Sequence, residues 1–132
     1  MLQLGLHSDK PIYEQIVEQV KYHVIKGHLQ PHEPIPSVRK LALELGITPG
    51  TVARAYQELE QAHIIETIKG KGTFIAAKPA FRQDEDKVKE VRRKMTACIL
   101  ELKMMGMDNA AIMEMVKEAC RELEDAGEED KT

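Results

Sequence analysis

The sequence lacks any long apolar run and has only two cysteines among its 132 residues. No stretch approaches the ~20 apolar residues that a membrane-spanning helix needs, and the first nine residues lack the basic-then-apolar pattern of a secretion signal. The composition therefore predicts a folded, water-soluble, cytoplasmic protein. Cys98 and Cys120 stand in helical-looking sequence without Cys-x-x-Cys spacing, so we expect small buried hydrophobic residues rather than a disulfide or metal ligands.

Features typical of enzymes are also missing. The sequence has no nucleophile and base at a recognisable spacing, no glycine-rich phosphate loop and no paired carboxylates in an apolar context. Five histidines are present: His7, His23, His28, His32 and His63. His28 and His32 have the i, i+4 spacing of a helical metal site, but Pro31 between them favours an exposed loop. We therefore expect no catalytic residues, no metal site and no cofactor.

The formal net charge of −3 is unevenly distributed along the chain. Residues 1–78 have nine Lys or Arg and eight Asp or Glu, whereas residues 79–132 have ten and fourteen. Acidity therefore belongs to the C-terminal part, and the N-terminal part is weakly basic. Binding of nucleic acid would require a local basic face, doubled by dimerisation, and would depend strongly on salt.

Apolar spacing and capping residues predict a helix-turn-helix in the N-terminal part. Pro11 is placed to begin a helix that ends at Gly27, and the three prolines of Gly27–Pro36 interrupt the helical pattern. Ser37 is a suitable N-cap for a short helix that Gly46 ends. Thr48 would cap a third helix, with Pro49 at its first position and Val52, Ala55, Tyr56 and Leu59 on its buried face.

Two short strands and two further helices follow. Residues 64–68 and 73–76 read as a β-hairpin joined by the glycine-rich turn Lys69–Gly72, a wing. Lys78-Pro79 and polar residues mark a boundary, so we expect a winged helix-turn-helix domain over residues 1–78 and a helical region over 79–132. Asp108 would cap the last helix, and residues 124–132 look frayed. The predicted fold is mainly α with a small β-hairpin.

The two C-terminal helices predict a dimer interface, because so short a segment cannot bury a large apolar surface by itself. Their apolar residues recur at steps of three and four and suit a four-helix bundle of two chains. The interface residues would be Val88, Val91, Met95, Cys98, Leu102, Met105, Ile112, Val116 and Leu123. In the alternative, the apolar faces of both C-terminal helices fold back on the winged domain of the same chain.

The motifs Pro36-Ser37-Val38-Arg39-Lys40-Leu41-Ala42, Leu45-Gly46-Ile47-Thr48, Thr51-Val52 and Gly70-Lys71-Gly72-Thr73-Phe74 occur in this order. Together they resemble the DNA-binding domain of GntR-type regulators over nearly all of residues 8–77. Thr51–Tyr56, followed by a tail of about 50 residues, looks most like the YtrA-like subfamily, in which a two-helix tail dimerises. The resemblance implies a repressor without a larger effector-binding or aminotransferase-like domain.

The face of the third helix opposite its core predicts the base contacts. Arg54 can donate to guanine, Gln57 can donate to adenine, and Gly50 allows close approach of the backbone. Thr48 and Thr51 flank the helix N-terminus, where phosphates are favoured. Lys69, Gly70, Lys71 and Gly72 form a cationic wing tip without obstructing Cβ atoms at its glycines.

The resemblance adds Ser37 and Arg39, the latter as a phosphate or base contact. This sequence departs from many relatives in having Pro49 and Ala53 where they have basic residues. That departure shifts the expected base contact to Arg54.

These features predict a DNA-binding transcriptional regulator, a repressor that binds a pseudo-palindromic operator as a homodimer. The alternative is a protein-interaction module that uses a winged-helix fold. The sequence names no operator, no regulated gene and no small-molecule effector.

Overall fold

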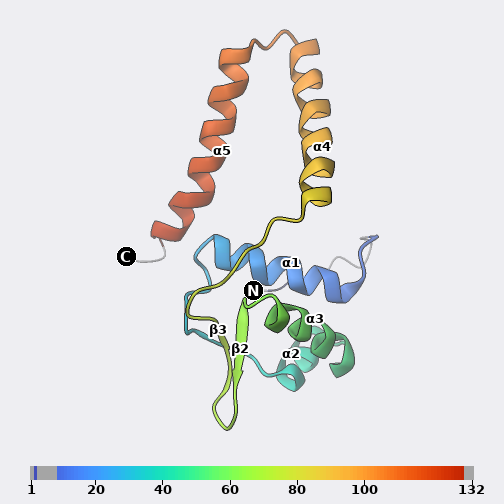
Figure 1. The fold of residues 1–132 in the computed structure, drawn as a ribbon, viewed down its shortest axis with the longest axis vertical. Coiled ribbons are helices and arrows are strands. Elements are labelled where there is room, and N and C mark those ends of the chain that lie inside the picture. The colour runs from blue at the N-terminus through green and yellow to red at the C-terminus, as the bar shows by residue number, and fades with distance from the viewer. Residues whose placement is uncertain (1, 3–8, 130–132) are drawn as a thin grey trace.

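The computed structural model describes residues 2 and 9–129, with side chains described as far as Glu124. Along the chain lie α1 (Ile12–Ile25), β1 (Pro34–Ile35), α2 (Val38–Leu45), α3 (Pro49–Gln61), β2 (Ile65–Ile68), β3 (Gly72–Ile75), α4 (Glu85–Met104) and α5 (Asn109–Glu129). Helices α1 to α3 and the strands form a winged helix-turn-helix, and α4 and α5 extend from it as a long helical hairpin (Figure 1). The expected mainly α fold with a small wing is confirmed.

Local signals begin and end the helices close to the predicted positions. The Ser37 hydroxyl accepts a hydrogen bond from the Lys40 N–H at 3.2 Å and caps α2, and Gly46 ends that helix at φ 68°. Pro49 is the first residue of α3, as predicted. Pro11, in contrast, is not the first helical residue of α1, because it has the extended ψ of 149° and occupies the N-cap position.

The sheet contains a strand that the sequence pattern did not predict. Within the described residues it has the order β1-β3-β2, with both pairings antiparallel. β1 is only two residues long, and its first residue, Pro34, has no N–H to donate to a neighbour. Such a strand suits a sheet edge, which is where β1 lies. The proline-rich connection therefore supports the base of the wing instead of being only a loop.

One apolar core joins α1, α2, α3 and the sheet. The side chains of Ile16, Val52, Leu59, Ile64 and Ile75 are fully buried in it. The predicted buried face of α3 is confirmed, since Val52, Ala55, Tyr56 and Leu59 are all buried. This core holds the helix-turn-helix and the wing as one unit.

The two C-terminal helices begin at aspartate caps. The Asp84 carboxylate accepts hydrogen bonds from the N–H groups of Asp86 and Lys87, and the Asp108 carboxylate accepts one from the Ala111 N–H at 2.9 Å. The prediction that the chain is frayed from residue 124 is wrong for residues 124–129, because α5 continues to Glu129. Residues 130–132 lie outside the described residues. Among the described helices, none combines the length and apolarity needed to cross a membrane.

Candidate nucleic-acid interface

The wing and the helix-turn-helix lie at the end of the molecule opposite the C-terminal hairpin. In Figure 1 the β2–β3 hairpin extends furthest at the bottom and α2 lies beside it, whereas α4 and α5 leave from the opposite side. The surface formed by the hairpin tip, the start of α2 and the N-terminal half of α3 is called the binding face below. Residues predicted to contact DNA from three separate segments therefore belong to elements on the same side of the molecule.

Two cations lie in the first turn of α2. Arg39 and Lys40 are both exposed directly after the Ser37 cap. Neither takes part in any ion pair found among the described residues. Their charges are therefore available to an anionic partner. Arg39 was predicted to contact DNA and Lys40 was not, although both follow the same cap.

The first turn of α3 differs from the expectation in the role of Thr48. Thr48 occupies the N-cap position, but its side chain makes no capping hydrogen bond. Its hydroxyl instead lies 3.0 Å from the hydroxyl of Thr51, one turn along the helix. The predicted side-chain cap is therefore wrong. The two exposed or half-exposed hydroxyls form a polar pair at the helix N-terminus, where the helix dipole favours negative charge.

The outer face of α3 carries Gly50, Gln57 and Gln61, which are all exposed. A Cβ atom built on Gly50 meets no atom of the chain within 4 Å, so packing inside the protein does not require glycine there. A glycine in the first turn of a helix costs stability relative to alanine. The open space beside Gly50 is therefore consistent with the close approach of a partner.

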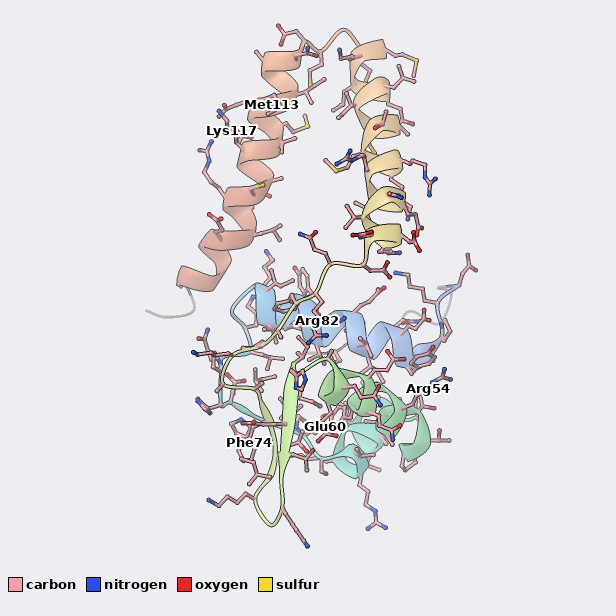
Figure 2. All side chains as sticks on the ribbon, viewed as in Figure 1. Arg54, Glu60, Phe74, Arg82, Met113 and Lys117 are labelled. Atoms are coloured by element: carbon pink, nitrogen blue, oxygen red, sulfur yellow. The ribbon has the colours of Figure 1, made fainter. Side chains whose placement is uncertain are left out.

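Arg54 is exposed, and its guanidinium contacts an aromatic ring of α1. Its guanidinium carbon lies 3.7 Å from the centroid of the Tyr13 ring, which belongs to α1. Figure 2 shows Arg54 beside α1, on the side of the domain away from the wing. Helical angles placed Arg54 on the outer half of α3 but could not show this contact with Tyr13. The contact of Arg54 with guanine stays a prediction.

Tyr56 fixes the position of α3 relative to the start of α2. Its phenol donates a hydrogen bond to the Pro36 carbonyl oxygen at 2.6 Å, across 20 residues of sequence. Burial of the ring, with a smaller effect from the charge of Glu44, raises the pKa of Tyr56 to about 12. Because Pro36 directly precedes the Ser37 cap, this bond ties the start of α2, which carries Arg39, to the recognition helix.

The wing tip presents two lysines on a turn that requires glycine. The Lys71 N–H donates to the Ile68 carbonyl oxygen at 2.9 Å, and Gly70 and Gly72 have φ of 81° and 120°. Those angles are strained for any residue with a Cβ. Lys69 and Lys71 are exposed and belong to no ion pair found in the described part of the chain.

The apolar stripe of α4 is exposed in the single chain. Val88 and Val91 are each 43% exposed, Met95 is 50% exposed and Met105 is 75% exposed. On α5, Ile112 is buried, but Val116 and Leu123 are exposed. Burial of these stripes within the chain is thus limited to Ile112 and, in part, Leu102. The expected burial of Cys98 and Cys120 is wrong for the single chain, where both thiols are exposed.

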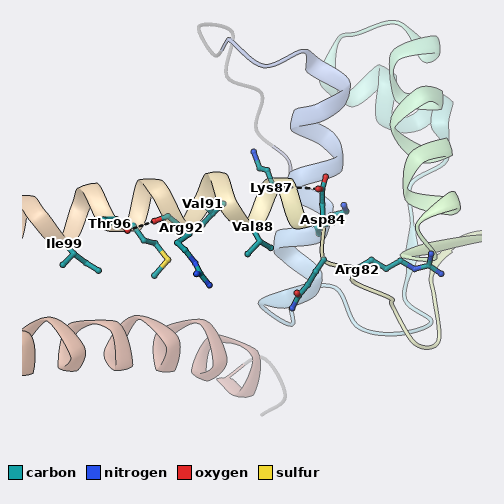
Figure 3. A pocket seen from close by; sticks show the side chains of 11 residues that line it. Arg82, Asp84, Lys87, Val88, Val91, Arg92, Thr96 and Ile99 are labelled. Atoms are coloured by element: carbon teal, nitrogen blue, oxygen red, sulfur yellow. Dashed lines mark hydrogen bonds between the residues drawn. The ribbon is translucent and has the colours of Figure 1, made fainter.

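An open groove of about 770 Å³ runs along the same face of α4. Its apolar lining includes Val88, Val91, Met95 and Ile99, and cationic side chains such as Arg92 stand at its edge. Figure 3 shows Val88, Arg92 and Ile99 extending from α4 on the side where α5 lies. The rest of the lining comes from Lys21 of α1 and from the linker residues Arg82, Gln83 and Asp84.

Comparisons with known proteins agree with this architecture. The profile described as "Bacterial regulatory proteins, gntR family" matches residues 12–75. The transcriptional repressor YtrA of Bacillus subtilis is 36% identical over 118 residues, which is 89% of this chain and 91% of that protein. A transcriptional antiterminator from Listeria monocytogenes is 41% identical, with a TM-score of 0.65 over 93% of this chain and 92% of its own. The DNA-binding domain of AraR in complex with operator ORX1 is 27% identical, with a TM-score of 0.50 over 57% of this chain and 93% of its own.

Proposed function

Because the chain belongs to the GntR family of bacterial regulators and resembles its YtrA-like members, we propose that it is a repressor that binds a pseudo-palindromic operator as a homodimer. Family membership itself makes it a DNA-binding transcriptional regulator and not an enzyme. The repressor assignment rests on the name of the Bacillus subtilis relative. AraR, a more distant structural relative, binds its operator through a domain of the same fold.

The observation that carries DNA binding is the arrangement of cations on the binding face. Arg39, Lys40, Lys69 and Lys71 come from two separate elements, are exposed, and belong to no ion pair of the described residues. We propose that α3 enters the major groove with Gly50, Thr51 and Gln57 toward the bases. Arg39 and the Thr48 and Thr51 hydroxyls would contact the backbone at its edge. The wing tip, Lys69–Gly72, would reach the adjacent minor groove or its phosphates.

Arg54 takes a positioning role in this proposal. Its guanidinium would hold α3 against α1 through Tyr13, so that the angle of the recognition helix is fixed before DNA binds. Base readout would then rest on Gln57 and on close backbone approach at Gly50 rather than on arginine. Ser37 would act through its cap of α2, which orients Arg39.

The exposed stripe of α4 supports the homodimer. Large contiguous apolar surfaces on a folded chain mark interaction sites, and the groove along Val88, Val91 and Met95 stays open in the single chain. Two such hairpins would fill each other's groove and form a four-helix bundle of residues 79–132. The hairpin lies opposite the wing (Figure 1), so a two-fold axis through it would leave both binding faces free.

Selection of bound fragments from genomic DNA by the purified chain tests the proposed function. The selected duplexes should contain two related half-sites about one helical turn apart. Arg39→Ala should weaken binding to the selected duplex by about 1–3 kcal/mol relative to the native chain, whereas Arg121→Ala, on α5, should not. No enrichment of any sequence, or an Arg39→Ala chain that binds as tightly as the native one, would overturn the proposal.

A further inference from the structure

Two histidines converge at the C-terminal end of α1. Nδ1 of His23, in the last turn of the helix, lies 2.9 Å from Nδ1 of His28, and the ring centroids are 5.1 Å apart. In the sequence, His28 has the i, i+4 spacing of a helical pair with His32. The structure instead pairs His28 with a helical residue five positions before it.

The backbone between the two rings is held in place. Gly27 turns the chain with φ of 79°, and the Leu29 N–H then donates to the His23 carbonyl oxygen at 3.1 Å. Leu29 is buried in the core, which anchors the far side of this turn. The Tyr22 ring meets both imidazoles edge-on, at centroid distances of 5.3 Å and 6.5 Å. The backbone turn therefore holds the two rings close together before a ligand binds.

We propose that His23 and His28 bind one divalent transition-metal ion of the zinc, copper or nickel class through their two Nδ1 atoms. Zinc lies about 2.0–2.1 Å from each imidazole nitrogen, so two nitrogens of one coordination sphere are roughly 2.9–3.4 Å apart. The observed 2.9 Å falls at the lower end of that span. Imidazole suits these ions, whereas magnesium and calcium prefer oxygen ligands.

The same distance fits a hydrogen bond in which one Nδ1–H donates to the other Nδ1. On metal binding that proton leaves Nδ1 of the donor ring, and both neutral rings have their proton on Nε2. The metal takes the place of that proton, but because it is about 2.0 Å from both nitrogens it lies off the line that joins them, so each imidazole has to turn to bind it. Affinity should fall as the pH is lowered, because both ligands must be neutral.

The helices near the pair carry charges of both signs. α5 packs against α1, and its C-terminal end lies near the C-terminal end of α1 (Figure 1). That helix carries the exposed carboxylates of Glu118, Glu122 and Glu124. The positive charge of Lys26, whose ammonium lies 5.8 Å from the Tyr22 ring centroid, opposes the negative charge of these carboxylates. We therefore expect nitrogen ligation, and not charge alone, to set the affinity.

Two protein ligands leave coordination positions for water or carboxylate. Within the described residues, no group of three or more His, Cys, Asp and Glu is placed to hold a metal. An open site of this kind binds reversibly, unlike a closed structural zinc centre. The pair also lies on the α5 side of the winged region, away from the wing (Figure 1), so metal binding can be measured without DNA.

Calorimetric titration of the full chain near neutral pH, with zinc and nickel chloride as probes and magnesium chloride as the control, tests the proposal. The expected result is one zinc or nickel ion per chain and no response to magnesium. His23→Gln and His28→Gln should each weaken zinc binding by more than about 10-fold, the smallest loss typical of an outer-shell partner. His32→Gln and His63→Gln, at exposed positions with φ of 67° and 59°, should keep the native affinity.

Nuclear magnetic resonance of the imidazole protons gives a second readout. Zinc should shift the ring resonances of His23 and His28 and leave those of His32 and His63 in place. Because His28 is exposed, the His28→Gln chain should fold normally even if the His23→Gln chain does not. Absence of zinc binding by the native chain, equal affinity in all four variants, or shifts at His32 or His63 instead would overturn the site.

Discussion

The guanidinium of Arg54 lies over the aromatic ring of Tyr13, with its central carbon 3.7 Å from the ring centroid. This contact joins the recognition helix to α1, the helix that also contacts α5. A cation over an aromatic face is attracted by the ring quadrupole. The contact therefore links the orientation of α3 to α1, the helix on which α5 of the C-terminal hairpin packs.

Removal of this contact should cost stability and affinity but not sequence preference. Arg54→Ala and Tyr13→Leu should show a coupling energy of about 0.5–1 kcal/mol in a double-mutant cycle of urea unfolding. Operator affinity should fall in Arg54→Ala, while the ratio of affinities for operator and scrambled duplex stays unchanged. Zero coupling, together with a relaxed preference, would instead make Arg54 a base contact.

Gly50→Ala should change stability and DNA binding in opposite directions. The added methyl group meets no atom of the chain, so the helix should gain about 0.5–1 kcal/mol of stability. The same methyl group should weaken operator binding if the backbone approaches DNA closely at this position. Thermal unfolding and operator titration check the two effects. A variant that is more stable and binds as tightly would mean that DNA does not approach Gly50.

Lys71→Ala should weaken binding to operator and scrambled duplexes alike. Loss of one phosphate contact makes the slope of log affinity against log salt shallower by about 0.9, and by twice that in a dimer. Lys103→Ala, near the end of α4 furthest from the wing, is the matched control and should leave the slope unchanged. An unaltered slope in Lys71→Ala would show that the wing does not touch the DNA backbone.

Tyr56→Phe should destabilise the winged region by about 1–3 kcal/mol, because the Pro36 carbonyl loses its donor. The pKa of Tyr56 is about 12 in the folded chain, against 10.0 for an ordinary tyrosine. Between those values the unfolded chain releases the phenol proton and the folded chain keeps it. The free energy of unfolding contributed by Tyr56 is therefore complete below pH 10 and lost as the pH rises to 12.

Unfolding by urea at a series of alkaline pH values checks this. The native chain should lose more stability over that interval than Tyr56→Phe does. Tyr22→Phe, at a tyrosine that is 47% exposed, should behave like the native chain. Parallel curves for the native chain and Tyr56→Phe would mean that the phenol is not held by the fold.

Much of the fold follows from local sequence signals, because caps and periodicity act over a few residues. Ser37, Gly46 and Pro49 were sufficient to place α2 and α3. Two of the misses are set by partners distant in the chain. β1 exists because β3 pairs with it, and Arg54 is held by a tyrosine 41 positions earlier. The spacing of apolar residues along the sequence cannot predict contacts of this kind.

The candidate site was predictable to the same degree. Helical angles selected the exposed positions Gly50 and Gln57, and the glycine pattern located the wing tip. The His23–His28 pair escaped because its geometry depends on the turn at Gly27 rather than on helical spacing. The tail stripe was recognised by its spacing, but its exposure in the single chain could only come from the structure.

A charge on the α4 stripe should separate the two chains without unfolding either. Val91→Glu places a carboxylate at a position that is 43% exposed in the single chain but would be buried in the bundle. An unpaired buried charge costs several kcal/mol, so dimerisation should weaken by roughly 100-fold or more. Ala97→Glu, which lies about 120° away from Val91 around the same helix by its 100° periodicity, should leave dimerisation intact. Sedimentation velocity of both variants makes the comparison.

The mass of the protein–operator complex tests the account most directly. Sedimentation of the full chain with a duplex that contains one selected operator should give two chains per duplex, with no stable complex of one chain. This follows if the exposed α4 and α5 stripes join two winged regions across a two-fold axis. A complex of one chain per duplex with the full operator affinity would contradict it.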